Sequence, residues 1–289
     1  MADLEKLGKE QNPLRKYFRQ PKVYLNLPSR GIFYPPGAID LPENGEVPIY
    51  AMTAKDELTM KTPDALLNGQ ATVDLIKSCV PNIKDPWMMP SVDLDAVLIA
   101  IRIATYGDTM ELTTSTPVTG AEKDFSVDLN SLLGDITGHQ FETEIDIEEF
   151  HVRLRPLTYR EFTDVSLKTF EEQRVFALVN DDKMSEQEKL AKFNESFKKL
   201  TEINITTLSK SISSIQIGDD EVTSQKHIDE FIANCDKNFF KEVTDHLEKQ
   251  KDKFNIKPLN ITATEEERKA GVPETYEVPI TFDQSNFFA

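Results

Sequence analysis

Residues 91–107 of this 289-residue chain read Ser91-Val92-Asp93-Leu94-Asp95-Ala96-Val97-Leu98-Ile99-Ala100-Ile101-Arg102-Ile103-Ala104-Thr105-Tyr106-Gly107. Apolar side chains fill almost every position of the second half, so a helix here has almost no polar face. A helix of this kind is stable where other parts of the protein cover it. We therefore predict a buried helix that Ser91 caps at its start and that Gly107 ends.

Three charged residues interrupt this apolar segment, namely Asp93, Asp95 and Arg102. Aspartates suit the positive end of the helix dipole, and a long arginine side chain can carry its guanidinium out to water. We therefore expect the aspartates to emerge at the start of the helix and Arg102 to reach solvent. The alternative is a buried polar contact that fixes a partner or a loop.

A predicted β-hairpin follows the helix. It comprises residues 112–122 and the alternating strand 125–129. A zinc knuckle has the pattern Cys-Pro-x-Cys-Gly at such a turn, because two thiolates two residues apart can bind one metal. This chain has Thr116 and Thr119 at those positions, and threonine hydroxyls are poor zinc ligands. We therefore predict a degenerate zinc-ribbon-like hairpin without a metal, and no cofactor elsewhere.

A second stretch near the C-terminus resembles the first. It runs from Asn260 to Thr264, through Gly271, to an alternating segment at 276–283. Both stretches have a strand, a polar turn with glycine and an alternating strand that ends near an aspartate. A chance likeness is the alternative to a shared shape. We predict a C-terminal β-hairpin, and we expect both hairpins to serve as shape rather than chemistry.

Local signals predict the remaining elements. Thr158 with Glu161 and Ser185 with Glu188 have the spacing of capping boxes, which open helices. Residues 1–20 are typical of a weak helix with charged faces. Strands are expected from Val23, at 46–50, between 139 and 155, and at 215–217, and helices from Thr53, Thr62 (with a break at Gly69), Thr158, Ser185, Ser224 and Asp236.

Together these elements predict an α+β fold, since no βαβ repeat with glycine-rich turns occurs. We expect an N-terminal arm over 1–22 and a mixed α+β domain with the first hairpin over 23–137. A strand pair and a helical block should occupy 138–252. The C-terminal hairpin and an aromatic tail should occupy 253–289.

The composition restricts the partners and the compartment. The net charge is −17, and a protein that tracks nucleic-acid phosphates needs clustered basic residues. The basic cluster at residues 15–22 is expected to be a solvated helix face, with an RNA contact as the alternative. Cys79 and Cys235 cannot form a disulfide framework or a metal set. The N-terminus lacks the apolar core of a signal peptide, and the sequence has no run of about 20 apolar residues that could span a membrane. We therefore expect a cytosolic protein that binds neither nucleic acid nor membranes.

Catalytic motifs are missing from the sequence. No Walker loop, Rossmann fingerprint or Gly-x-Ser-x-Gly elbow occurs. The four histidines, at 139, 151, 227 and 246, lie apart in the sequence, and His246 is expected to pair with Glu242 on an exposed helix face. The many acidic residues make carboxylate pairs easy to find, which weakens any argument for a glycosidase. We therefore predict that the protein is not an enzyme.

Two short segments are candidates for contacts with other proteins. Arg30 and Gly31 lie in an extended apolar stretch near Tyr34, where arginine suits interfaces and glycine permits close backbone approach. An ordinary turn is the alternative. Phe287 and Phe288 must bury against their own domain or against another chain. We predict all five residues as partner-binding.

Several short motifs, which follow one another along the chain, resemble the T4-type phage baseplate family. They are Leu27-Pro28-Ser29-Arg30-Gly31 with Tyr34, Met52-Thr53-Ala54-Lys55-Asp56-Glu57, Cys79-Val80, Asp85-Pro86, and Asp95–Arg102 ending in Tyr106-Gly107. The resemblance covers residues 23–135. Members of that family often have Cys-Pro-x-Cys-Gly after the Tyr-Gly pair, and this chain departs from the pattern there. The helical block at 157–252 is expected to be an added region.

The resemblance implies a function in the tails of contractile phages, because the family's members are assigned to the baseplate hub or to its assembly. The protein would then be a non-enzymatic structural component that contacts hub, tube or tape-measure proteins. It would assemble in the host cytoplasm and remain in the virion. The alternative is an assembly chaperone for hub or tape-measure chains, which leaves before the particle is complete.

Overall fold

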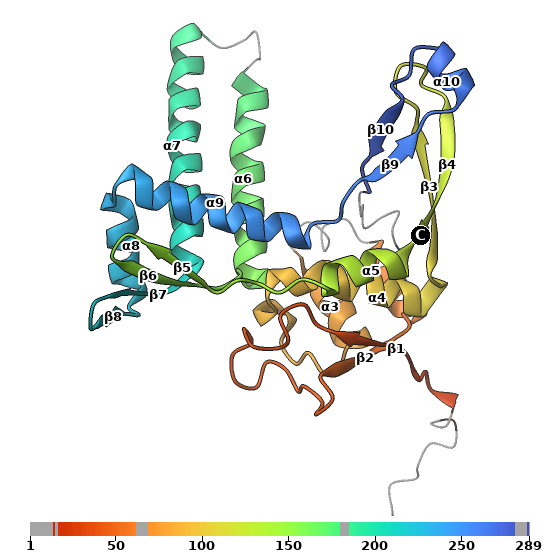
Figure 1. Ribbon diagram of the computed structural model, residues 1–289, viewed down its shortest axis with the longest axis horizontal. Coiled ribbons are helices and arrows are strands. Elements are labelled where there is room, and N and C mark those ends of the chain that lie inside the picture. Colours follow the sequence, from red (N-terminus) through yellow and green to blue (C-terminus); the bar gives the residue numbers. More distant parts are fainter. Residues whose placement is uncertain (1–13, 15–16, 62–68, 180–184, 281–287, 289) are drawn as a thin grey trace, which may run out of the picture.

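The computed structural model confirms an α+β fold (Figure 1). It describes residues 14, 17–61, 69–179, 185–280 and 288. Most of the predicted N-terminal helix and the segment after Thr62 lie outside these residues. Small antiparallel sheets, three of two strands and one of four, alternate with helices along the described chain.

The apolar segment forms helix α4 (Leu94–Tyr106), which lies among the N-terminal elements as predicted. The side chains at 96, 97, 99, 100 and 101 are fully buried, because β1 (Pro21–Asn26), β2 (Glu46–Tyr50) and α3 (Gln70–Cys79) pack around them. Helix α1 (Ala54–Met60) packs on α3 and begins with the predicted capping pair of Thr53 and Asp56. Gly107 ends α4 with a φ of 99°, which favours glycine.

The predicted start of α4 is wrong. Ser91 does not cap the helix but begins a short 3₁₀ turn, η3 (Ser91–Asp93), which follows the turn η2 (Pro86–Met88). Asp93 is the N-cap residue of α4, and its carboxylate caps no helical N–H group. The reason is that this carboxylate binds a distant loop instead.

Helix α5 (Leu129–Thr137) was not predicted. The Asp128 side chain accepts a hydrogen bond of 2.9 Å from the backbone N–H of Asn130 and so caps this helix. In the sequence, the alternation of apolar and polar residues up to Leu129 hides the start of this helix. Asp128 is both the last residue of strand β4 and the N-cap residue of α5. The fully buried Leu129 joins the two elements in the core.

The middle of the chain forms the four-stranded sheet. Its strands β5 (Glu144–Ile147), β6 (Phe150–Leu154), β7 (Ile212–Ile217) and β8 (Asp220–Val222) pair antiparallel in sequence order. Helices α8 (Gln225–Asn234) and α9 (Lys237–Phe254) follow. Phe150, Phe231 and Phe239 meet with ring centroids 5.0–5.4 Å apart, which joins the sheet to both helices.

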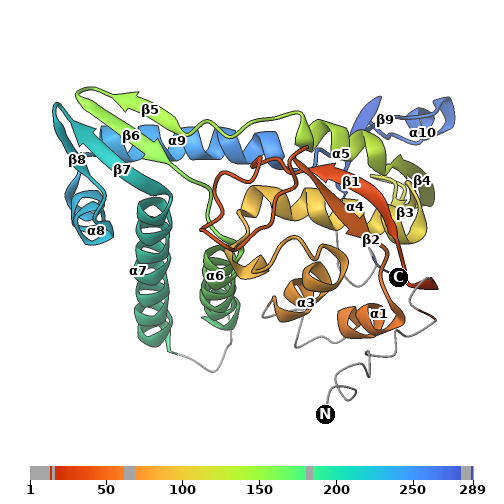
Figure 2. The ribbon, with the colours of Figure 1, turned by 90° about the horizontal axis from the view of Figure 1, so that it is seen from below.

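Between β6 and β7, α6 (Tyr159–Val179) and α7 (Glu186–Lys210) form a helical hairpin that projects from the body (Figures 1 and 2). Both predicted capping boxes are present. Ser185 and Glu188 exchange hydrogen bonds at the start of α7. Glu161 accepts from the Thr158 N–H at 2.9 Å and from Arg155, so the strand end and the helix start are tied together.

The central and the C-terminal two-stranded hairpins lie side by side and form an arm (Figure 1). The first consists of β3 (Thr109–Ser115) and β4 (Glu122–Asp128). The second consists of β9 (Leu259–Thr262) and β10 (Thr275–Val278), and it contains an unpredicted helix, α10 (Glu265–Lys269). A salt bridge of 3.0 Å between Lys123 and Glu267 and a small core around Tyr276 join them.

One main core draws side chains from residues 25 to 288, and a smaller core lies within the arm. The predicted division at 22, 137 and 252 stays a prediction. Across the described ranges, no helix is both long enough and apolar enough to cross a membrane.

Candidate partner-binding site

A loop at residues 27–34 is fixed to the start of α4 by one buried carboxylate. The Asp93 side chain is fully buried and accepts hydrogen bonds from the backbone N–H and the hydroxyl of Ser29, at 2.7 and 2.6 Å. It also accepts from the Tyr34 hydroxyl at 3.0 Å. Three donors on one carboxylate make this loop a rigid part of the core.

Our expectation that Asp93 is solvated is therefore wrong, and the alternative of a buried contact that fixes a loop is correct for this residue. Burial raises the pKa of its carboxyl from 3.8 to about 6. The hydrogen bonds from Ser29 and Tyr34 act in the opposite direction, because they stabilise the charged form.

The fixed loop presents Arg30 and Ile32 to solvent. Arg30 and Gly31 both have positive φ angles, 53° and 76°, so the chain turns sharply here. A β-carbon at Gly31 would lie 3.0 Å from the Leu41 side chain, so glycine permits the close approach of the two segments. Ile32 is 63% exposed and Leu41 is 38% exposed. We call the surface formed by Arg30, Ile32 and Leu41 the loop surface.

The other residues predicted at partner contacts lie elsewhere. Tyr34 points inward to Asp93, and burial raises the pKa of its hydroxyl well above 10. Phe287 lies outside the described residues. Phe288 is 3% exposed and packs in the main core of its own chain. Tyr34 and Phe288 therefore act inside the protein, because their side chains are already used for intramolecular packing and hydrogen bonding.

Arg102 is half-buried and extends into water less than we expected. Its guanidinium stacks on the Tyr106 ring, 4.5 Å from the centroid, and its Nε and Nη1 are buried with no hydrogen-bond partner among the described residues. The Tyr106 hydroxyl donates to the carbonyl oxygen of Phe288 at 3.1 Å, with the Glu57 carboxylate at 3.3 Å. The end of α4 thus holds the C-terminal tail.

Asp95 is half-buried and has no hydrogen-bond partner in the part of the chain that the structure describes. Burial raises the pKa of its carboxyl to about 6. An acid whose pKa is raised on folding destabilises the folded state above that pKa, and the loss disappears as pH falls through about 6 toward its ordinary value of 3.8.

We therefore expect Asp95→Asn to raise the free energy of unfolding at pH 7 by about 1–2 kcal/mol. The gain should shrink toward pH 4, where the wild-type carboxyl is protonated in the folded state and partly protonated in the unfolded state. Urea unfolding at pH 4, 5.5 and 7 measures both values. A variant less stable than wild type at pH 7 would contradict the prediction, because it would mean that the Asp95 charge has a partner.

The turn of the first hairpin is closed by its threonines. The Thr116 hydroxyl donates to the carbonyl oxygen of Ala121 at 2.8 Å, and the Thr116 side chain is buried. Thr119 lies in the same turn, where its hydroxyl accepts a 3.5 Å hydrogen bond from the Ala121 N–H. The zinc-ribbon-like character of this hairpin stays a prediction. Among the described residues, no three His, Cys, Asp or Glu side chains gather as metal ligands do.

The described part of the basic cluster near the N-terminus, Arg19 and Lys22, is not a solvated helix face. Arg19 lies against the core, where its guanidinium donates to the carbonyl and hydroxyl oxygens of Ser78, at 2.5 and 2.8 Å, and lies 3.6 Å from Asp56. Lys22 is exposed on β1. Arg15 and Lys16 lie outside the described residues. Arg19 therefore joins the N-terminal segment to α1 and α3.

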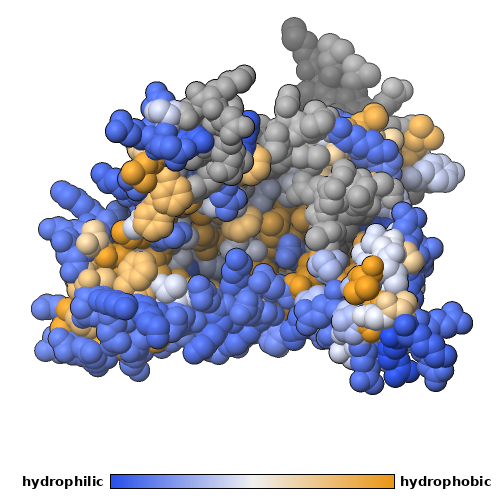
Figure 3. Space-filling model, turned by 90° about the horizontal axis from the view of Figure 1, so that it is seen from above, coloured by the Kyte–Doolittle hydropathy of each residue, from blue (hydrophilic) through white to orange (hydrophobic). Residues whose placement is uncertain are grey.

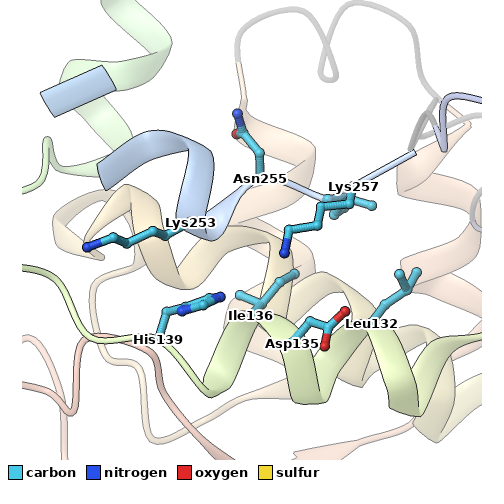
Figure 4. Close-up of a pocket in the computed structure, with 8 residues that line it drawn as sticks. Leu132, Asp135, Ile136, His139, Lys253, Asn255 and Lys257 are labelled. Atoms are coloured by element: carbon cyan, nitrogen blue, oxygen red, sulfur yellow. The ribbon is translucent and has the colours of Figure 1, made fainter. Parts of the chain in front are cut away.

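Two concave regions of the described surface hold no catalytic arrangement. One is a cavity of about 10 Å³ between α5 and the end of α9 (Figure 4), which has room for about one water molecule. The other is a shallow hollow of about 390 Å³ beside the end of α4. Neither brings a nucleophile next to a general base. Their lining residues are Leu132, Asp135, Ile136, His139, Lys253, Asn255, Ile256 and Lys257 in the first and Lys22, Val23, Ile103, Ala104, Thr105, Gly107, Asp108 and Asn130 in the second.

The histidines remain apart in the fold. His139 lines the small cavity and contacts the Phe254 ring. His151 pairs with Asp146 at 2.6 Å on the outside of the sheet. His246 lies 3.4 Å from the Glu142 carbonyl, and His227 is exposed. No arrangement for acid–base catalysis is built from them.

One known protein family matches this chain. A family model described as "T4 bacteriophage base plate protein" matches residues 38–274. This match is longer than the resemblance over 23–135 and includes the helical block. It begins after the Ser29–Tyr34 loop, so that motif lies outside the matched residues. No curated protein and no solved structure matches the chain.

Proposed function

The chain belongs to the T4 bacteriophage base plate protein family, and from this membership we propose that it is a structural component of the hub region of a contractile-tail baseplate. The observation that carries the proposal is a family match over residues 38–274, most of the chain. The protein has a structural role in a phage baseplate and interacts with other tail proteins. The hub position, the contractile tail and the non-enzymatic role are our proposals.

The direct neighbours that we propose are hub, tube or tape-measure proteins, met in the host cytoplasm during tail assembly. The loop surface supports this proposal. It combines the exposed charge of Arg30 with the exposed side chain of Ile32 on a loop that Asp93 holds rigid. A rigid surface loses little conformational entropy when a partner binds.

An assembly chaperone that leaves before the particle is complete is the second candidate. The exposed phenylalanines on α6 and α7 favour it, because such side chains can cover an apolar helix of a client protein. The net charge of −17 would keep such a carrier soluble.

Quantitative mass spectrometry of purified, salt-washed phage particles separates the two candidates. A baseplate component is expected at a fixed copy number that fits the symmetry of the baseplate. The absence of its peptides from particles, with abundant protein in the infected-cell lysate, would overturn the structural proposal and favour the chaperone.

The loop surface can be tested in the same phage. Arg30→Glu with Ile32→Lys should lower the number of complete tails at least about tenfold, since a loss of about 1.4 kcal/mol in one contact has that effect on binding. Both side chains are exposed, and the hydrogen bond from Arg30 to the Thr137 carbonyl oxygen is long at 3.5 Å, so the free protein should keep its stability. Arg268→Glu on the exposed face of α10 is the matched control. Normal assembly with the double variant would exclude the loop surface as a partner site.

A further inference from the structure

The α6–α7 hairpin has one open apolar face. Phe162 and Phe170 on α6 are 40% and 52% exposed, and Leu190 and Phe197 on α7 are each 61% exposed. The spacings of eight and seven residues place each pair on one side of its helix. We call these four residues the apolar face. Single exposed hydrophobic side chains are common on soluble proteins, whereas a contiguous group marks an interaction site.

Phe170 and Phe197, one ring from each pair, lie on the same side of the hairpin. Phe170 directly follows the half-buried Thr169, and Phe197 directly follows the buried Ser196. Each ring is therefore rotated by about 100° from the seam between the helices, in the same sense. Antiparallel helices are related by a two-fold axis through their seam, so equal rotations bring both rings to one side. Figure 3 shows apolar side chains on the left of the molecule seen from above, and others at its centre and right.

Apart from Glu186, which precedes Leu190 by four residues and so shares its side, the charged residues of α7 lie away from this face. Glu188, Glu195 and Glu202 repeat along the opposite side of α7. On the open side, the neighbours of the apolar face are the uncharged Ser166, Gln173, Thr201 and Asn204, and Arg174 borders it with its guanidinium 5.9 Å from the centre of the Phe170 ring. The two helices contain eight basic and eight acidic residues, and residues 180–185 between them add one net negative charge, so the hairpin is nearly neutral although the chain carries −17.

We propose that a second copy of this chain covers the apolar face, so that two α6–α7 hairpins form a four-helix bundle around a two-fold axis. A nearly neutral hairpin is the part of an acidic chain that another copy can approach at the smallest electrostatic cost. The hairpin also projects from the body, which holds the two acidic bodies apart (Figure 1). The same residues then meet on both copies, as a two-fold interface requires.

The size of the face suits a dimer. At 1.5 Å per residue, the 25 residues of α7 extend over about 37 Å, and two packed helices are about 20 Å wide. The whole hairpin side that carries the face therefore measures at most about 700 Å² per copy, near the roughly 800 Å² that each partner buries in a stable complex. This inference does not depend on the position of the protein in the tail.

Sedimentation velocity of the full chain over about 1–100 μM tests the proposal, because interfaces of this size bind in the micromolar range or more tightly. We expect a dimer that tightens between about 0.05 and 0.5 M salt, since salt screens repulsion between the acidic bodies and leaves the apolar contact intact. Phe170→Lys with Phe197→Lys should raise the dissociation constant at least about 30-fold. Leu190→Lys is a further variant, in case the double variant does not fold.

Ala191→Lys is the matched control, because it adds one lysine on the opposite, exposed side of α7 and should leave the dimer unchanged. A chain that stays monomeric at about 100 μM would overturn the proposal. So would a dimer that survives the lysine substitutions, or one that dissociates as salt is added. A purified tail protein that binds the monomer through this face would assign it to another partner.

Discussion

Replacing Asp93 with alanine is expected to lower the free energy of unfolding by about 3–4 kcal/mol at pH 7. The carboxylate accepts two hydrogen bonds from Ser29 and one from Tyr34, and its side chain is fully buried. Alanine would leave three donors without an acceptor in the core. Removal of the buried carboxylate offsets part of this loss, because the raised pKa of Asp93 shows that burial disfavours its ionised form. Urea unfolding followed by circular dichroism measures the change.

Two variants make this experiment specific. Asp93→Asn keeps the size and one carbonyl acceptor, and the hydroxyls of Ser29 and Tyr34 can reorient toward its amide, so its loss should be less than half that of alanine. Asp95→Ala removes an aspartate two residues further on that has no partner among the described residues, and it should not destabilise the protein. A loss below about 1 kcal/mol for Asp93→Ala would mean that the loop at 27–34 is not held by this carboxylate.

Replacing Phe288 with alanine is expected to lower the free energy of unfolding of the isolated chain by about 3 kcal/mol. The side chain is 3% exposed and belongs to the main core, and its carbonyl oxygen accepts from the Tyr106 hydroxyl at 3.1 Å. The deletion of a buried aromatic ring leaves a cavity that the surroundings fill only in part. Thermal and urea unfolding of the purified chain give the value.

The same measurement decides between the two roles considered for the aromatic tail. A ring that anchors another protein would be exposed in the free chain, and its removal would leave the stability of that chain unchanged. Phe18→Ala provides the comparison, since this ring is 56% exposed and its loss should change stability by less than about 0.5 kcal/mol. Equal effects at Phe18 and Phe288 would contradict self-docking of the tail.

Much of the fold could be predicted because its signals are local. The apolar segment around Ile99 identified the buried helix α4, and the pairs Thr53/Asp56 and Ser185/Glu188 located helix starts within three residues of sequence. Helices α5 and α10 were missed for a local reason as well. Each is short and lies beside a strand or within a hairpin, where alternating residues dominated the pattern.

The candidate site was predicted only in part. Arg30 is part of the loop surface, and Gly31 lies in the same loop. A contact of these residues with a partner stays a prediction. Asp93 was assigned to solvent, because an aspartate at a helix start is usually solvated and the sequence does not show that Ser29 lies next to it. No signal in the sequence distinguishes Asp93, with three donors, from Asp95, which has none among the described residues.

The sequence by itself determined the α+β class, the buried helix, the helix caps and the membership in the baseplate family, because periodicity, capping and short motifs act over a few residues. Only the tertiary structure decided that Asp93 and Phe288 are buried and that the apolar face is exposed. Asp93 meets a residue 64 positions away, and Tyr106 meets a residue 182 positions away. Whether such a side chain is buried, paired or exposed depends on long-range packing, which no local pattern records.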